Sequence, residues 1–273
     1  MIENPQRSDL AGDLAAFDPS REAPGDPPEP VIQAAAWCVH FYTAIGLIFA
    51  AWIAVLVVRG GAEAFRWSFL LMVAACLVDA TDGTLARRFR VKSVLPEFDG
   101  RKLDDLVDFL TYTCLPLLLV WRAGLYPVGY EAWLLLPLMA SAYGFCQVDA
   151  KTDDGYFLGF PSLWNVVALY LYVLQLPPWV NFSVVTLLAV MTFVPTRYLY
   201  MSLPGRLNRI SNFIGTPWII LLVVILWRLP SDAPLAPGEP TWWLGVASLY
   251  FPAFYMIASW VISFRLRHVP IAA

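Results

Sequence analysis

Long apolar runs separated by short polar stretches fill most of the chain after residue 33. The first run, residues 35–58, is long enough to cross a hydrocarbon core of about 30 Å at a rise of about 1.5 Å per helical residue. Seven further runs begin near Trp67, Leu106, Ala132, Leu163, Phe182, Phe213 and Trp242. The pattern predicts an all-α integral membrane protein of eight transmembrane helices.

Residues 1–33 differ from the rest because they are rich in Pro, Asp and Glu and poor in large apolar residues. Such a segment cannot bury enough apolar surface to offset the entropy lost on ordering. It also lacks the basic start, short apolar stretch and cleavage site of a secretory signal peptide. We therefore expect a disordered tail over residues 1–33 and one transmembrane domain over residues 34–273.

The composition supports a membrane location. Of the 273 residues, 59% are hydrophobic and 14% are charged, whereas soluble domains have about 25% charged residues. The 18 basic and 21 acidic residues nearly cancel, so the net charge says nothing about partners, and we expect no nucleic-acid partner. The four cysteines lie in apolar runs without the spacing of a metal site. With only two histidines, acid–base chemistry falls to carboxylates.

The basic residues predict the orientation once the loops are assigned to alternate sides. One side has only four of them: Arg59, Arg66, Arg122 and Arg228. The other fourteen are Arg7, Arg21, Arg87, Arg88, Arg90, Lys92, Arg101, Lys102, Lys151, Arg197, Arg206, Arg209, Arg265 and Arg267. Because basic loops stay in the cytoplasm, both termini and the loop between the second and third helices are predicted to be cytoplasmic.

Acidic residues cluster where the second run ends and the third begins. If the second helix continues past its apolar part, Asp79 and Asp82 share one face with three further residues: Gly83, Ala86 and Arg87. In the next helix the spacing of four residues puts the following on one stripe: Gly100, Asp104 and Asp108. Two neighbouring helices thus present two carboxylates each.

Four carboxylates at a membrane edge are costly unless they are paired, and such groups usually have a function. Mg²⁺ and Mn²⁺ prefer oxygen ligands, and four Asp charges balance two such ions. Two metals about 3.5–4 Å apart recur in enzymes that displace groups at phosphorus. A glycine such as Gly83 lets a ligand approach the helix backbone, and Arg87 offers a fork of donors to phosphate.

The segment resembles the signature of the CDP-alcohol phosphotransferase family, which is Asp-x-x-Asp-Gly-x-x-Ala-Arg, a spacer, and Gly-x-x-x-Asp-x-x-x-Asp. All eight fixed positions are present. The resemblance implies that Asp79, Asp82 and Asp104 are metal ligands, and that Asp108 binds the second metal and acts as the catalytic base. It also implies that four residues line the CDP moiety: Gly83, Ala86, Arg87 and Gly100.

Within the family, the long spacer and the segments 95–105 and 159–165 are similar to those of the bacterial phosphatidylcholine synthases. The resemblance implies transfer of the phosphatidyl group of CDP-diacylglycerol to choline, with two divalent cations, in the bacterial inner membrane. It also implies a homodimer. The second and third helices would form the walls of a polar cavity open to the cytoplasm, which membrane lipids enter from the bilayer.

Choline carries a quaternary ammonium without an N–H donor, so aromatic ring faces and negative charge must bind it. Tyr112 extends the stripe of Asp104 and Asp108 by one turn, although ordinary packing between helices explains its position equally well. Three aromatic residues near the cytoplasmic halves of later helices are further candidates for the choline site: Tyr143, Trp164 and Tyr198.

Other interpretations of the acidic cluster fit less well. A haloacid-dehalogenase phosphatase needs an Asp where this chain has Ala80, and it needs a soluble α/β sheet. A transporter would place acids near mid-membrane on several helices. Another acceptor such as serine, inositol phosphate or glycerol phosphate remains an alternative, but a phosphorylated acceptor calls for basic residues beside Asp108, and the helix has none between Lys102 and Arg122.

Overall fold

The computed structural model describes residues 30–147, 156–199 and 206–266, and these ranges are mostly helical. The first half contains α2 (Pro30–Arg59), α3 (Ala62–Arg88), α4 (Val91–Val94), α5 (Gly100–Asp108), the π-helix η1 (Phe109–Cys114), α6 (Leu115–Arg122), the 3₁₀ helix η2 (Glu131–Leu134) and α7 (Leu135–Cys146). The second half contains β1 (Tyr156–Leu158), α8 (Trp164–Leu174), α9 (Pro178–Thr192), β2 (Arg197–Leu199), α10 (Arg206–Arg228), α11 (Pro240–Ser248) and α12 (Tyr250–Arg265).

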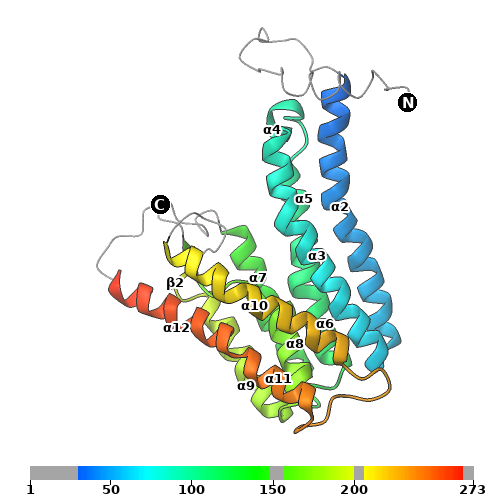
Figure 1. The fold of residues 1–273 in the computed structure, drawn as a ribbon, viewed down its shortest axis with the longest axis vertical. Helices are drawn as coiled ribbons and strands as arrows, with labels where there is room; N and C mark the ends of the chain where they lie inside the picture. The colour runs from blue at the N-terminus through cyan, green and yellow to red at the C-terminus, as the bar shows by residue number, and fades with distance from the viewer. Residues whose placement is uncertain (1–29, 148–155, 200–205, 267–273) are drawn as a thin grey trace, which may run out of the picture.

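The helices α2 and α3 stand side by side and run in opposite directions (Figure 1). The helix α2 begins at Pro30, where proline is tolerated because the first N–H groups of a helix have no intrahelical acceptor. Residues 30–33 are therefore helical, and the helix starts earlier than predicted. The remainder of the predicted tail, residues 1–29, lies outside the described residues.

The helix α3 continues unbroken through the whole motif segment and ends at Arg88, which confirms that Asp79 and Asp82 lie on one helix. The chain then turns at Arg90, which has a positive φ of 49°. Asp99 caps the start of α5 because its side chain accepts a hydrogen bond from the Lys102 N–H over 3.3 Å. The second half of the motif thus begins where a capped helix begins, at Gly100.

The third predicted helix is continuous from Gly100 to Arg122 but changes its winding on the way. Its middle section, η1, is a π-helix. Such wide turns are rare in proteins in general, but those that occur are often at functional sites. The section α6 after it buries Leu115, Leu117 and Leu119 in the main core. One helix therefore presents acids at its start and apolar side chains to the core at its end.

The helices α7 to α12 lie beside the lower part of the α2–α3 pair, and α10 and α12 run obliquely to it (Figure 1). The helix α10 contacts α3. The helix α8 is buried over nearly its whole length and occupies the centre of the core. A small antiparallel sheet pairs β1 with β2, with Phe157 opposite Tyr198. This sheet was not predicted, because two strands of three residues leave no periodic pattern in the sequence.

Each of the eight predicted apolar runs contains helix. Four helical segments are long and apolar enough to cross a membrane by length and composition: Pro30–Arg59, Ala62–Arg88, Asn208–Arg228 and Pro240–Arg265. Three others are apolar but shorter: Glu131–Cys146, Trp164–Leu174 and Pro178–Thr192. The expectation of a helical membrane protein is confirmed, while the count of eight spans stays a prediction.

Two of the four arginines predicted to lie away from the cytoplasm bind helix ends. Arg66 donates from Nε and Nη2 to the carbonyls of Leu226 and Trp227 over 3.1 and 3.0 Å. Arg122 Nε donates to the carbonyl of Val58 over 3.4 Å. The ends of α2, α6 and α10 and the start of α3 thus lie at one end of the bundle, as the alternation of loops requires.

Candidate active site

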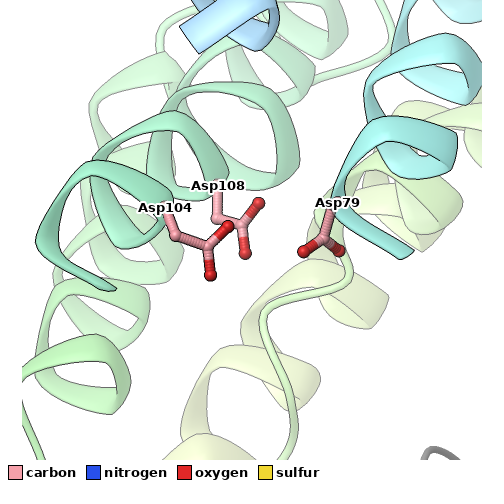
Figure 2. Close-up of side chains that lie close together, drawn as sticks. All are labelled: Asp79, Asp104 and Asp108. Carbon is pink, nitrogen blue, oxygen red and sulfur yellow. The ribbon is translucent and has the colours of Figure 1, made fainter. Parts of the chain in front are cut away.

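Three of the four motif carboxylates converge between α3 and α5. One carboxylate oxygen from each of Asp79, Asp104 and Asp108 lies within 4.8 Å of the others. Asp79 projects from α3 toward the two acids of α5, which are one turn apart on the same face (Figure 2). Carboxylates from the two halves of the motif therefore lie together in the structure.

The carboxylate cluster fits a hard divalent cation. Asp108 Oδ1 is buried and has no hydrogen-bond partner among the described residues, and an unpaired buried carboxylate oxygen is costly. The three acids repel one another at this separation. An ion such as Mg²⁺ or Mn²⁺, which prefers oxygen ligands, removes both costs.

Asp82, the fourth motif acid, lies one turn from Asp79 and outside this group of three. Its side chain is 6% exposed, and its Oδ2 accepts a hydrogen bond of 2.7 Å from Thr43 Oγ1 of α2. The backbone N–H of Gly83 also interacts with this carboxylate, and a carboxylate with these donors still has lone pairs for further partners. Its predicted role as a metal ligand stays a prediction.

Tyr112 reaches the acidic cluster by its hydroxyl. Its Oη donates to Asp79 Oδ2 over 2.8 Å. The residue lies in the π-helix η1. Its position was predicted from the spacing of a regular α-helix, and the turn that it occupies is wider than that. The sequence correctly placed this residue beside the acids, but it did not predict a bond to Asp79.

The four residues expected to line CDP have different surroundings. A Cβ at Gly83 would meet only Arg87 Nη1, at 3.5 Å, so the backbone there is open. Arg87 is exposed, and its Nη2 donates to Thr84 Oγ1 over 3.0 Å. Ala86 is half-buried and packs against the small apolar cluster around Val91 and Val94. A phosphate group can therefore approach Gly83 and Arg87.

Gly100 has a packing role that the sequence did not indicate. A Cβ at this position would lie 2.5 Å from Cε1 of His40 in α2, which is too close for a side chain. His40 is itself 6% exposed and packs on Phe98, with 4.4 Å between the ring centroids. Because Gly100 has no side chain, the start of α5 can lie close to α2.

The other three predicted choline residues lie in separate surroundings. Trp164 is 1% exposed, and its Nε1 donates to Ser141 Oγ over 2.7 Å. Tyr198 is fully buried in β2 and packs on Tyr255. Tyr143 is exposed on α7 and packs on Phe193. Their roles in choline binding stay predictions.

Thr43 is a residue of the site that the sequence did not indicate. It belongs to the first apolar run, where a lone threonine usually satisfies its hydroxyl within its own helix. Its spacing of three residues from His40 was the available signal, because two polar residues then share one face of an otherwise apolar helix. Only the structure shows that this face contacts Asp82 and Gly100.

Comparison with known proteins agrees with the geometry. The sequence pattern of the CDP-alcohol phosphatidyltransferase family matches residues 40–195, which is more than half of the chain and includes all four motif acids. The chain belongs to the CDP-alcohol phosphatidyltransferase family. Membership makes it an enzyme of this type, and the carboxylate cluster of α3 and α5 is the family signature in three dimensions.

Several members of the family are similar over most of their length. The phosphatidylcholine synthase of Pseudomonas aeruginosa is 37% identical over 223 residues, which cover 81% of this chain and 91% of that protein. The phosphatidylcholine synthase of Borreliella burgdorferi is 30% identical over 85% of this chain and 96% of that protein. The enzyme of that name from Bradyrhizobium diazoefficiens is 36% identical over 77% of each chain.

Proposed function

We propose that this chain transfers the phosphatidyl group of CDP-diacylglycerol to choline and releases CMP. The convergence of Asp79, Asp104 and Asp108 carries the proposal, because a cluster of oxygen ligands at a helix pair suits phosphoryl chemistry. The similarity to proteins named phosphatidylcholine synthase, over most of the chain, supports choline as the acceptor. The product is phosphatidylcholine.

Two divalent cations, Mg²⁺ or Mn²⁺, would be held by Asp79, Asp82, Asp104 and Asp108. When bound, they supply positive charge that stabilises the charge on the phosphate oxygens. The chain itself contributes the anionic ligands and holds them on two packed helices. Gly83 leaves the helix backbone accessible to the cytidine diphosphate, and Arg87 lies one turn beyond Asp82 with donors for its phosphates.

Asp108 acts as the general base in this proposal. Its carboxylate accepts the proton of the choline hydroxyl, the choline oxygen bonds to the β-phosphorus, and the bond from that phosphorus to the oxygen of CMP breaks. The unpartnered Oδ1 of Asp108 supports this assignment, because it has a free lone pair in a buried position. General-base catalysis typically contributes about 10²–10⁴ in rate.

Tyr112 would supply one aromatic face for the choline head group, with Tyr143, Trp164 and Tyr198 as further candidates. Its hydroxyl contact with Asp79 supports the assignment, because it keeps the ring beside the acidic cluster. Negative charge next to an aromatic ring is the environment that a quaternary ammonium requires. The ring and the acids together would favour choline over neutral alcohols.

The orientation and the assembly are part of the proposal. The excess of basic residues on one side supports a cytoplasmic location for both termini and for the cavity between α3 and α5. Choline would then enter from the cytoplasm, and CDP-diacylglycerol from the inner membrane. A homodimer is proposed on the family resemblance alone.

The deciding experiment supplies the purified protein with CDP-diacylglycerol, Mn²⁺ and one alcohol at a time, and identifies the lipid product by mass spectrometry. Choline should give phosphatidylcholine and stoichiometric CMP. Robust product with serine, inositol phosphate or glycerol phosphate in place of choline would overturn the acceptor assignment. Absence of CMP release with every alcohol would favour a binding or transport protein instead.

A further inference from the structure

A threonine outside the motif holds one of the motif acids. Thr43 Oγ1 donates to Asp82 Oδ2 over 2.7 Å, and the two side chains are 7% and 6% exposed. The same hydroxyl lies 3.4 Å from the carbonyl oxygen of Val39 in its own helix. A hydroxyl has one proton, and the shorter contact is within the normal range for an O–H donor. The hydroxyl proton of Thr43 therefore forms the hydrogen bond to Asp82.

The fold sets the position of this hydroxyl closely. Thr43 belongs to the buried stripe of α2, whose members recur at helical spacing: Ile32, Ala36, Val39, His40, Thr43, Gly46, Ala50, Ile53 and Val57. On either side of it, α2 is pressed against the α5 helix, at Gly46 by Val107 and at His40 by Gly100. Because a β-branched side chain has few rotamers in a helix, the hydroxyl has little freedom to turn away.

A second contact keeps α2 and α3 in register without Thr43. Tyr42 Oη and Thr81 Oγ1, the neighbours of Thr43 and Asp82 in sequence, lie 2.7 Å apart in a hydrogen bond between the same two helices. Both helices also pack along their length (Figure 1). Removal of the Thr43 hydroxyl therefore leaves the helix pair intact and takes away only the donor to Asp82.

We infer that Thr43 is a positioning residue for the metal site, which orients the Asp82 carboxylate toward a bound cation by its hydrogen bond to Oδ2. Carboxylates that bind metals are in turn held by hydrogen bonds from outside the coordination shell, and loss of such a partner typically lowers metal affinity by about 10–100-fold. This inference rests on the proposed metal-dependent function, because it takes Asp82 as a ligand. It makes α2, which has no motif residue, part of the site.

The test is the affinity for Mn²⁺ of the purified full chain in detergent, measured without substrate from the paramagnetic resonance signal of free Mn²⁺. Thr43→Val keeps the shape of the side chain and removes the hydroxyl, and it should weaken Mn²⁺ binding by about tenfold or more. Thr43→Ser restores the donor and should bind within about threefold of the unaltered chain. Thr192→Val is the matched control, because Thr192 is a buried threonine of α9 whose hydroxyl bonds the Leu188 carbonyl of its own helix.

The outcomes separate the inference from the function on which it rests. Equal Mn²⁺ affinity in Thr43→Val and the unaltered chain, with or without a lower melting temperature, overturns the positioning role. If the unaltered chain binds no Mn²⁺, or if Asp104→Asn does not weaken binding, the proposed metal site itself is wrong. If Thr43→Val does not fold, Thr43→Ala carries the same test, since it also removes the hydroxyl.

Discussion

The Tyr112 hydroxyl donates a hydrogen bond to Asp79 over 2.8 Å, so its aromatic ring is held beside the acidic cluster. Tyr112 therefore has two separable parts. Its ring is a candidate surface for the choline ammonium, and its hydroxyl holds the carboxylate that α3 contributes to the cluster. Two substitutions at one position can distinguish these parts.

Tyr112→Ala removes both parts and should raise the choline KM by roughly three- to thirtyfold, because one cation–π contact is worth about 0.5–2 kcal/mol. Tyr112→Phe keeps the ring and should leave the choline KM within about twofold, while it weakens Mn²⁺ binding by about tenfold through Asp79. Steady-state kinetics and Mn²⁺ titration measure the two effects. An unchanged choline KM in Tyr112→Ala would exclude the ring from the choline site.

The metal ligands are tested by Asp79→Asn, Asp82→Asn and Asp104→Asn. Each change removes an anionic ligand that an amide does not replace for a hard cation, so each should abolish turnover while the protein keeps its helical circular dichroism and its elution volume. EDTA should stop the unaltered enzyme, and Mg²⁺ or Mn²⁺ should restore it. Near-normal activity in one variant would remove that residue from the ligand set.

The base is tested by Asp108→Asn. Turnover should fall by about 10²–10⁴, while affinity for CDP-diacylglycerol without choline should change much less, because the donor rests mainly on the other acids, Gly83 and Arg87. Calorimetric titration of the donor and single-turnover kinetics give the two quantities. A parallel collapse of both would make Asp108 primarily a metal ligand and would place the base elsewhere.

The two motif glycines next to the cluster should respond differently to alanine. Gly100→Ala places a Cβ against His40 and should lower the free energy of unfolding by about 1–3 kcal/mol, the usual cost of overpacking. Gly83→Ala meets only the end of Arg87, so it should keep the melting temperature and raise the KM for CDP-diacylglycerol. Thermal unfolding and donor kinetics on both variants provide the comparison.

His40→Ala serves as the control for the first of these changes. In the background of His40→Ala, the added methyl of Gly100→Ala has space, so the second substitution should cost much less than it does alone. An equal cost in both backgrounds would show that Gly100 is required for its backbone conformation or for a ligand, and that the contact with His40 is incidental.

The motif helices could be predicted because residues close together in the sequence determine them. The spacing of Asp79, Asp82, Asp104 and Asp108 alone fixes which carboxylates share a helix face, and the long apolar runs identify the helices that carry them. The expected cytoplasmic cavity and the metal role of Asp82 depend on how those helices pack, so they stay predictions. The bond from Tyr112 to Asp79 likewise required the structure, because it joins residues of different helices.

The features that the sequence did not predict are the ones that depend on contacts between distant segments. Nothing in a run of apolar residues distinguishes a threonine that bonds its own helix from Thr43, which bonds Asp82 in the next one. Likewise, the motif glycine at Gly100 was interpreted through the ligand alone, although its nearest neighbour is His40, far back in the first helix. Helix periodicity gives the direction of a side chain, and tertiary packing gives its partner.

The wide turn η1 joins two sections of helix that are out of phase. Each residue of a regular α-helix advances the azimuth by about 100°, so one residue more or less between Asp108 and Leu115 rotates everything after it by that angle. With the π turn, α5 can direct its acids toward α3 while α6 directs Leu115 and Leu119 into the core. Deletion of one residue within Phe109–Cys114 would force the chain to satisfy either the acidic cluster or the core.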